Sequence, residues 1–434
     1  MARQMKDSGV EWIDEIPEEW EVARLKQVFN FGKGLPITKE DLVDKGIPVI
    51  SYGQIHAKSN TGVTVQQELI RYVPDVFRET NFDSFVSKND FILADTSEDL
   101  LGCGNCVFVD REMELFAGYH TIILRSTTTQ DNKYIAYLFL TDAWRSQIRS
   151  KVSGVKLFSI SRKILSEATV LVPPKDVQRR IAAFLDRRCA EIDAVIERTK
   201  ATIEEYKKLK QAVITEAVTK GVRGPRPMKD SGIEWIGEIP EGWEVLPHKY
   251  VMHKEKSICE HYAGEDIISL TMNGVIVRDL TAGGKMPTTF DGYQYVEPDD
   301  MLLCLFDIDV TPRCVGIVRN HGVTSPAYSR FKVHVGYYNA YYDYLLRFID
   351  DEKVFIHLSK NLRSSLTETD FGAIKTISPS YDEQVEIAIY LDEKCAAIDT
   401  LIAKKTALLT ELETYKKSLI YEYVTGKKEV PACP

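Results

Sequence analysis

The 434-residue chain contains no long apolar run, and this absence argues against a membrane-spanning helix. No hydrophobic stretch approaches the ~20 residues that such a helix requires. The N-terminal residues are polar and acidic, which predicts that there is no secretory signal. The eight cysteines are mostly scattered, so we expect reduced thiols in a cytosol.

Familiar catalytic signatures are also missing. There is no G-x-x-x-x-G-K-[ST] phosphate loop, and neither H-E-x-x-H nor G-x-S-x-G occurs. The double proline Pro173-Pro174 is followed by Lys175, whereas an amino-methyltransferase motif would need an aromatic residue there. These absences argue against these particular enzyme classes. An enzyme with unfamiliar motifs remains a competing hypothesis.

One C-x-x-C pair, Cys103-Gly104-Asn105-Cys106, raises the question of a metal. A structural zinc site takes four ligands, and no second Cys or His pair completes the set. We interpret the pair as a glycine turn between strands and expect no metal site.

Positive charge is scarce overall, because the formal net charge is −9 and the sequence pI is near 5.6. A nucleic-acid-binding protein usually has a basic surface. The charge is uneven, however, and residues 143–163 contain six cations and no acidic residue. Such a local stripe can bind phosphates although the whole chain is acidic. The alternative is an ordinary solvated face. The six cations are Arg145, Arg149, Lys151, Lys156, Arg162 and Lys163.

The sequence contains an internal repeat. Residues 5–22 return as residues 228–245 with three differences among eighteen positions, Val10/Ile233, Asp14/Gly237 and Glu19/Gly242. Residues 178–186 are echoed by residues 384–392. The segments between these markers differ in sequence and length. A fixed frame with divergent inserts is suited to a target with two different halves, of which DNA is the obvious example. Plain duplication with drift is the alternative.

Each repeat ends in a long expected helix with heptad spacing. The first runs from about Asp176 to Thr219, and Gly221 stops it. The second ends near Val424. Neither stripe can be buried alone, so we expect the two helices to pack antiparallel around a pseudo-twofold repeat. Cys189 and Cys395 occupy equivalent packing positions. The other residues predicted to line the helix interface are Leu185, Ile192, Ile196, Ile203, Tyr206, Leu391, Ile398, Ile402, Leu409 and Leu412.

The divergent inserts are expected to be mixed α/β, which gives an α+β chain overall. Strands are expected near residues 47–50, 91–93, 106–109, 120–124, 301–305 and 315–318. One helix is expected in each copy, near Tyr134 to Ile148 and near Tyr341 to Ile349. The shared tyrosines Tyr134/Tyr341 and Tyr137/Tyr344 are three residues apart, a spacing that favours a core face over base stacking.

Taken together, the chain resembles the specificity subunits (HsdS) of type I restriction–modification systems. The matching motifs are Gly9-Val10-Glu11-Trp12-Ile13…Pro17…Trp20 with its copy at residues 232–243, and the two helix entries at residues 178–186 and 383–392. The resemblance covers the whole chain. One departure is Val177, where the second copy has Glu383.

The resemblance implies a division into framework motif (1–22), target-recognition domain 1 (23–172), central spacer helix (173–222), linker and second framework motif (223–245), target-recognition domain 2 (246–378), distal spacer helix (379–426) and tail (427–434). Each recognition domain would read one half of a bipartite, asymmetric double-stranded DNA target in phage defence. The chain itself would be non-catalytic and would hold no cofactor. The helices would dock two adenine-N6 methylation subunits that carry S-adenosylmethionine, and a motor–nuclease restriction subunit would join them in a prokaryotic cytoplasm.

Within this interpretation the six cations of residues 143–163 would mainly contact phosphates. In the second domain, charge and context suggest Arg313, Lys360 and Arg363. Two further alternatives remain: a related restriction system that is not type I, and a duplicated coiled-coil scaffold without a DNA role.

Overall fold

The computed structural model describes residues 3–128, 130–272, 274–281, 287–311, 313–359 and 364–431. The chain forms two compact units, which are described separately. Unit 1 comprises Met1–Thr199 with Ala407–Pro434, and unit 2 comprises Lys200–Thr406. Both chain ends therefore belong to unit 1, where the guanidinium of Arg3 donates to the carbonyl oxygen of Gly426 at 3.5 Å.

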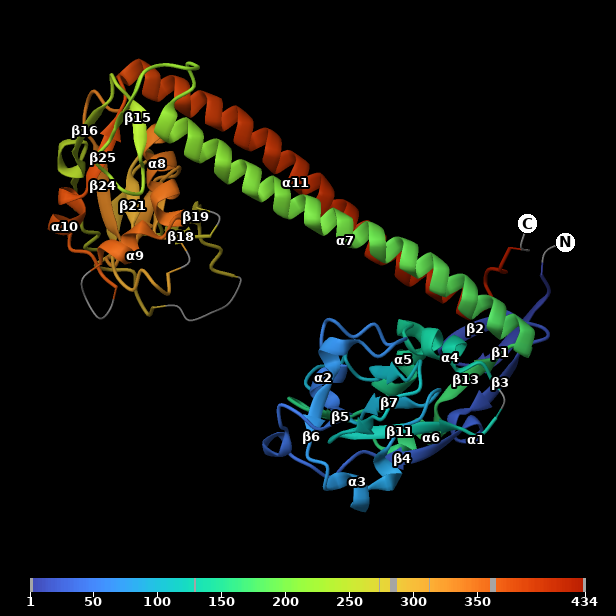
Figure 1. The fold of residues 1–434 in the computed structure, drawn as a ribbon. Coiled ribbons are helices and arrows are strands. Elements are labelled where there is room, and N and C mark those ends of the chain that lie inside the picture. The colour runs from blue at the N-terminus through green and yellow to red at the C-terminus, as the bar shows by residue number, and fades with distance from the viewer. Residues whose placement is uncertain are drawn as a thin grey trace. The chain divides into compact units, whose positions relative to one another are not determined.

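Two long helices, α7 (Lys175–Lys220) and α11 (Tyr381–Val424), confirm the helices predicted from heptad spacing (Figure 1). Each contributes to both units. In unit 1, Lys416 contacts Asp193 at 2.6 Å. In unit 2, Lys210 makes the corresponding contact with Asp399 at 2.7 Å. Within each unit the α7 and α11 segments run antiparallel, as predicted.

The predicted interface positions line this helix pair. Most of them are buried, as are the two cysteines, so Cys189 and Cys395 act as packing residues. The buried positions are Leu185, Ile192, Ile196, Ile203, Leu391 and Ile398. Tyr206, Ile402, Leu409 and Leu412 are half-buried.

Unit 1 places a four-stranded antiparallel sheet, β4-β11-β7-β9, beside a three-stranded sheet, β10-β5-β6, in which β10 and β5 are parallel. Pairs β1-β2, β3-β13 and β8-β12 complete it. Its strands are β1 (Met5–Val10), β2 (Ile13–Pro17), β3 (Glu21–Arg24), β4 (Phe29–Lys33), β5 (Ile47–Ile50), β6 (Arg71–Val73), β7 (Phe91–Ala94), β8 (Thr96–Ser97), β9 (Cys106–Phe108), β10 (Phe116–Ala117), β11 (Thr121–Ser126), β12 (Phe158–Ser159) and β13 (Thr169–Val172).

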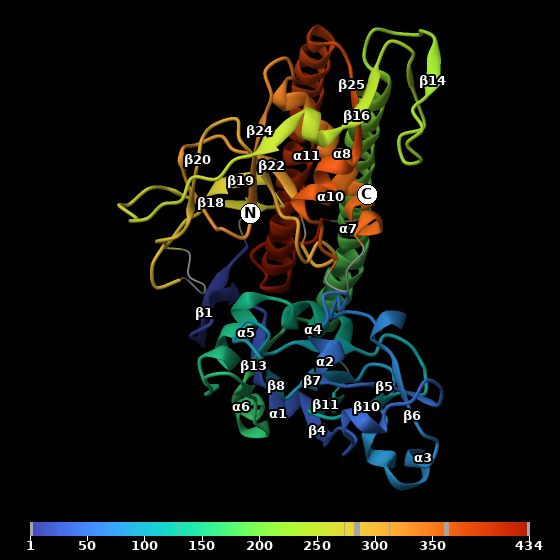
Figure 2. The same cartoon turned by 90° about the vertical axis from the view of Figure 1, so that its left-hand side faces the viewer.

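Unit 2 repeats the plan with two four-stranded sheets, β17-β24-β21-β22 and β19-β18-β23-β20, and the pairs β14-β15 and β16-β25 (Figure 2). Here β18 and β23 are parallel. Its strands are β14 (Met228–Asp230), β15 (Glu238–Pro240), β16 (Glu244–Pro247), β17 (Met252–Lys254), β18 (Ile267–Thr271), β19 (Gly274–Val277), β20 (Gln294–Val296), β21 (Met301–Leu303), β22 (Val315–Ile317), β23 (Gly322–Thr324), β24 (Ser329–Val333) and β25 (Lys375–Ser378).

The helix expected from Tyr134 to Ile148 is in fact two helices. Thr141 interrupts it, because its hydroxyl accepts from the backbone N–H of Trp144 and caps a new helix. The shorter helices are α1 (Leu25–Val28), α2 (Tyr52–Ile55), α3 (Phe77–Thr80), α4 (Asn132–Phe139), α5 (Asp142–Arg149), α6 (Arg162–Glu167), α8 (Asn339–Asp351), α9 (Val354–Leu358) and α10 (Glu368–Ala373). Among the described helices, none is long and apolar enough to cross a membrane.

Candidate nucleic-acid interface

Each recognition domain is fastened to the helix pair by the same tyrosine. The hydroxyl of Tyr134 donates to the carbonyl oxygen of Val424 at 2.8 Å, near the C-terminus of α11. The hydroxyl of Tyr341 donates to Val218 near the C-terminus of α7 at 3.0 Å. Both rings are fully buried. The core interpretation of these tyrosines is therefore confirmed, and Tyr134 and Tyr341 are inaccessible to bases.

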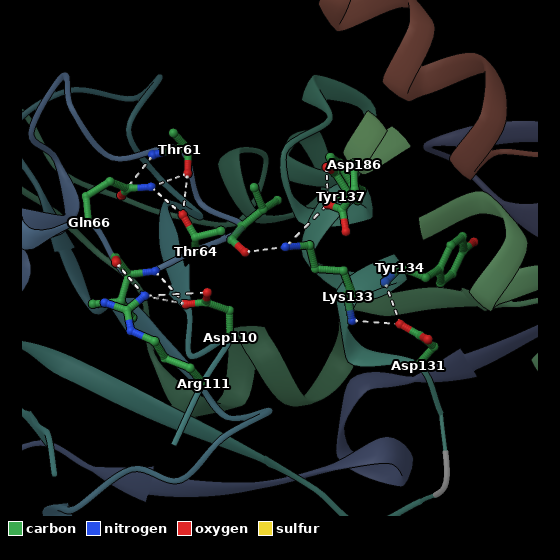
Figure 3. Close-up of polar contacts among 12 residues, drawn as sticks. Thr61, Thr64, Gln66, Asp110, Arg111, Asp131, Lys133, Tyr134, Tyr137 and Asp186 are labelled. Atoms are coloured by element: carbon green, nitrogen blue, oxygen red, sulfur yellow. Dashed lines mark hydrogen bonds and ion pairs between the residues drawn. The ribbon is translucent and has the colours of Figure 1, made fainter. Parts of the chain in front are cut away.

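A second tyrosine contact recurs in both copies, and in unit 1 Lys133 joins it (Figure 3). The hydroxyl of Tyr137 donates to Asp186 on α7 at 2.6 Å, and Lys133 reaches the same carboxylate at 3.3 Å. Burial, followed by this hydrogen bond, raises the pKa of Tyr137, which keeps the hydroxyl protonated as a donor. In unit 2, Tyr344 donates to Asp392 at 2.8 Å.

The glutamine of each helix entry joins the helix to the start of the domain helix. Gln178 accepts from the backbone N–H of Asp131 and donates to the carbonyl oxygen of Pro173, both at 2.8 Å. Gln384 accepts from Tyr338 at 2.7 Å and donates to Pro379 at 2.9 Å. These contacts give a physical reason for the repeated Gln-x-x-Ile-Ala motif, since each glutamine satisfies two buried backbone groups.

Two of the predicted phosphate-contacting residues turn out to hold the domain together. Burial lowers the pKa of Arg145, and its Nε donates to the carbonyl oxygen of Phe139 at 2.8 Å. Arg149 is only 16% exposed and is held by Asp142 at 3.0 Å and by the carbonyl oxygen of Leu101 at 2.7 Å. Both predictions need correction, because helix α5 packs its arginines inward beside the buried Trp144.

The remaining cations of this stretch are accessible. Lys151 is 44% exposed, with Glu167 at 3.7 Å, and Lys156, Arg162 and Lys163 are also exposed. Lys156, Arg162 and Lys163 flank β12, which pairs with β8, and reach solvent around this short ladder. A phosphate contact needs such accessible cations. Their role in DNA binding stays a prediction.

One basic depression was not anticipated from the sequence. A cavity of about 420 Å³ is lined by Lys33, Arg125 and Arg162, together with Asp83 and other residues. Arg125 is held by the carbonyl oxygens of Asp83 and Phe85, each at 2.7 Å. Lys33 and Arg125 lie far from the 143–163 run in sequence. Only the strand pairing of β4 with β11 brings them together.

In the second domain, the structure does not support the choice of Arg313. Its guanidinium is 16% exposed and pairs with Asp350 at 3.3 Å and Asp351 at 2.7 Å. Arg313 therefore neutralises the C-terminal carboxylates of α8, and this prediction is corrected. Lys360 and Arg363 lie outside the described residues.

Cys103 and Cys106 are buried free thiols around Gly104, whose φ of +95° is typical of a glycine turn. The predicted turn is thus confirmed. Across the described ranges, no group of three His, Cys, Asp or Glu side chains is placed to hold a metal ion.

The geometry defines a class of protein: a duplicated α+β chain in which two different domains are mounted by matching contacts on one helix pair. A family model described as the type I restriction modification DNA specificity domain matches residues 17–205. The chain is 24% identical to the putative type I restriction enzyme MjaX specificity subunit of Methanocaldococcus jannaschii, and the match covers 96% of each chain. It is 23% identical to the EcoKI specificity subunit of Escherichia coli K12 over 63% of this chain and 53% of that protein.

Solved structures agree in fold. One, from work on complex assembly and conformational transition of the type I R-M system, has a TM-score of 0.67 at 15% identity and covers 95% of this chain and 99% of its own. The HsdS subunit of Thermoanaerobacter tengcongensis has a TM-score of 0.51 at 14% identity, with 95% and 98% covered. Together, these comparisons support an HsdS specificity subunit of a type I restriction–modification system. As a specificity subunit it is a recognition component and not an enzyme.

Proposed function

We propose that this chain reads a bipartite, asymmetric DNA sequence for a type I restriction–modification complex, one half-site per recognition domain. The observation that carries the proposal is that the contacts between each domain and the helix pair are repeated, whereas the rest of the two domains differs. The same buried tyrosine and glutamine contacts mount both domains, whereas their cations and loops differ. Two different readers on one frame are what an asymmetric divided target requires.

The partners follow from the family. The chain would dock two adenine-N6 methylation subunits, which bind the S-adenosylmethionine, and a motor–nuclease restriction subunit would join for cleavage. An apolar strip on the helix pair would suit such docking, because exposed apolar side chains that lie together mark interaction sites. Leu408 and Tyr415, both exposed, are seven residues apart on α11. The complex would act in the cytoplasm.

The first test is co-expression with the neighbouring methyltransferase gene, followed by methylation-sensitive sequencing of the host DNA. We expect N6-methyladenine at one split motif. Exchange of residues 23–172 for the corresponding domain of a relative should change only one half of that motif. A complex that forms without methylation would point to a related restriction system. Failure to form any complex would favour a scaffold without a DNA role.

The phosphate contacts have their own test. Lys151→Ala and Lys156→Ala should each weaken binding to all DNA sequences and lower the salt slope of log K by about 1. Both residues are exposed and neither is part of the packed core. Binding isotherms from 50 to 200 mM salt would measure the slope. A loss confined to one sequence would contradict the phosphate role.

A further inference from the structure

Domain 1 carries a cluster of polar and aromatic side chains at the point where β7 passes into β8. Asp95 follows β7, and its carboxylate Oδ1 accepts from the hydroxyl of Thr96 at 2.7 Å and lies 3.3 Å from Nδ1 of His120. The rings of Tyr52 and Tyr119 pack edge-on around His120, with centroids 5.4 and 6.0 Å away. This set is called the Asp95–His120 cluster below.

Hydrogen bonds of His56 hold the backbone next to the cluster in place. His56 contacts the carbonyl oxygen of Thr96 through Nε2 at 2.8 Å. Its other ring nitrogen, Nδ1, lies 3.1 Å from the side-chain amide of Asn105. These two contacts fix the tautomer, because Nε2 must donate to the carbonyl and Nδ1 must then accept. The cluster is thus backed by a second layer of hydrogen bonds that does not depend on any ligand.

Its outer side is open. The side chain of His120 is 57% exposed and that of Asp95 is 33% exposed. His120 also has a φ of +55°, a left-handed conformation that is uncommon for residues other than glycine. Strained backbone of this kind tends to concentrate at functional positions.

The position of the cluster places it among the accessible cations. Strand β12 pairs with β8 so that Ser159 lies opposite Thr96, and the backbone N–H of Ile160 donates to Asp95 at 2.7 Å. Lys156 lies two residues before this ladder and Arg162 two residues after Ile160. Phosphate contacts fix the register of a protein on DNA, while side chains that reach base edges supply the sequence information.

The strand registers identify the equivalent positions in domain 2. Leu124 pairs with Phe91 as Phe331 pairs with Met301, and Ile160 donates to Asp95 as Leu366 donates to Leu305. Residue 305 is therefore the counterpart of 95. By the same registers, Ala327 replaces His120, Pro326 replaces Tyr119, and Leu270 replaces Tyr52.

The contrast with the frame is informative. Most positions that mount the domains keep their chemistry in both copies, including the tyrosine and glutamine contacts described above, and Val177 in place of Glu383 is an exception. Aspartates 90 and 300, in the turns before β7 and β21, are likewise both retained and accept the same backbone N–H. At the Asp95–His120 cluster, in contrast, the polar and aromatic groups of domain 1 are replaced in domain 2 by Leu305, Ala327, Pro326 and Leu270. A structural role would be needed in both domains, whereas a role in reading one half-site is needed in one.

From these observations we infer that the Asp95–His120 cluster is the base-reading site of domain 1, and that it binds a base edge carrying an exocyclic amino group. Asp95 is an acceptor, and both of its side-chain contacts within the described residues use Oδ1, which leaves Oδ2 available. Carboxylates accept from amino groups of bases in the major groove. Tyr52 and Tyr119 would contact the neighbouring base by their rings. The inference rests on the proposed DNA-reading function.

The test uses the methyltransferase complex, once its split motif is known from sequencing. Asp95→Asn keeps the shape and alters the acceptor, and His120→Asn keeps a residue that tolerates the left-handed backbone. Competition binding on duplexes with each base pair substituted would be measured for both half-sites. We expect the cognate affinity to fall about 5- to 150-fold, with discrimination relaxed at one or two positions of the half-site read by domain 1.

Three readouts separate this result from a general defect. Discrimination at the other half-site, non-specific affinity and the salt slope should all stay unchanged. Glu11→Gln, which removes an exposed carboxylate of the framework motif, controls for the change in charge. Unchanged discrimination at every position of half-site 1 in both variants would overturn the inference while leaving the proposed function intact. Absence of sequence-specific methylation by the unmodified chain would overturn the proposed function itself.

Discussion

Units 1 and 2 use matching residues where a domain contacts the helix pair, and they differ at positions away from these contacts. Where a domain meets the helix pair, the two units use matching residues, such as Tyr134 and Tyr341. Where β7 and β21 end, the residues are unrelated: Asp95 is one-third exposed, whereas Leu305 is buried. Most mounting contacts are buried, and their polar groups need partners in each copy. Positions outside these contacts can diverge, and we propose that the divergence at the Asp95–His120 cluster reflects recognition.

One contact at the junction between domain and helix pair is present in unit 2 and missing in unit 1. Removing it from unit 2 is expected to have the largest effect on stability. In unit 2, Glu383 accepts from the indole N–H of Trp243 at 3.1 Å and pairs with Arg226, whose guanidinium lies over the same ring. Glu383→Val should lower the free energy of unfolding by about 3 kcal/mol, because it leaves a buried N–H and a largely buried cation without their acceptor. Denaturant unfolding of the full chain, followed by tryptophan fluorescence, would measure it.

Glu383→Gln is the matched control for this variant. It keeps an acceptor for Trp243 and removes only the charge, so its cost should be clearly smaller. Equal losses from both substitutions would show that the ion pair with Arg226, and not the indole hydrogen bond, stabilises the junction. No loss from Glu383→Val would contradict the contact altogether.

Much of the frame could be predicted from the sequence, because it depends on periodicity and repetition. The heptads gave the bounds of α7 and α11 to within a residue or so at most ends, and burial of Cys189 and Cys395 followed from their equivalent positions. The antiparallel pairing followed from the duplication. Local and repeated sequence patterns of this kind determine helix bounds and buried positions directly, so the structure agrees with them.

The candidate interface was harder to predict, because charge alone does not show where a side chain points. Arg145 and Arg149 belong to the basic run but face inward from α5, and Arg313 is held by two aspartates. Asp95 and His120 were missed because they are 25 residues apart and meet only through the pairing of β7 with β11. A comparison of equivalent strand positions between the two copies would have been the signal.

A second difference between the units predicts that the stability of unit 2 depends on pH. His248 is buried where unit 1 has Leu25, and burial lowers the pKa of His248 from 6.5 to about 4. Between these values the unfolded chain binds a proton that the folded unit does not, so stability falls as the pH drops from 6.5 towards 4. The loss should be about 1 kcal/mol at pH 5.5.

His248→Leu should remove this contribution, so that the variant loses less stability than the unmodified chain between pH 7 and pH 5.5. Urea unfolding at both pH values would measure the difference. Leu25→His is the reciprocal variant and should introduce the same pH dependence in unit 1. If the pH dependence of the His248→Leu variant equals that of the unmodified chain, the buried neutral histidine is not its source.

The smallest expected effect is a gain, obtained by giving unit 1 the contact that it lacks. Across the described residues, the buried indole N–H of Trp20 has no acceptor, and Val177 occupies the place of Glu383. Arg3 lies over the ring of Trp20, 5.3 Å from its centroid, as Arg226 lies over Trp243, and it lines one small cavity together with Val177. Val177→Glu should therefore raise the free energy of unfolding by about 1 kcal/mol, since a new hydrogen bond satisfies a buried donor. Val177→Gln would supply the acceptor without the charge and should recover part of the gain. Destabilisation by both variants would mean that the two junctions differ in packing around the tryptophan, and that their sequence equivalence does not extend to the hydrogen bond.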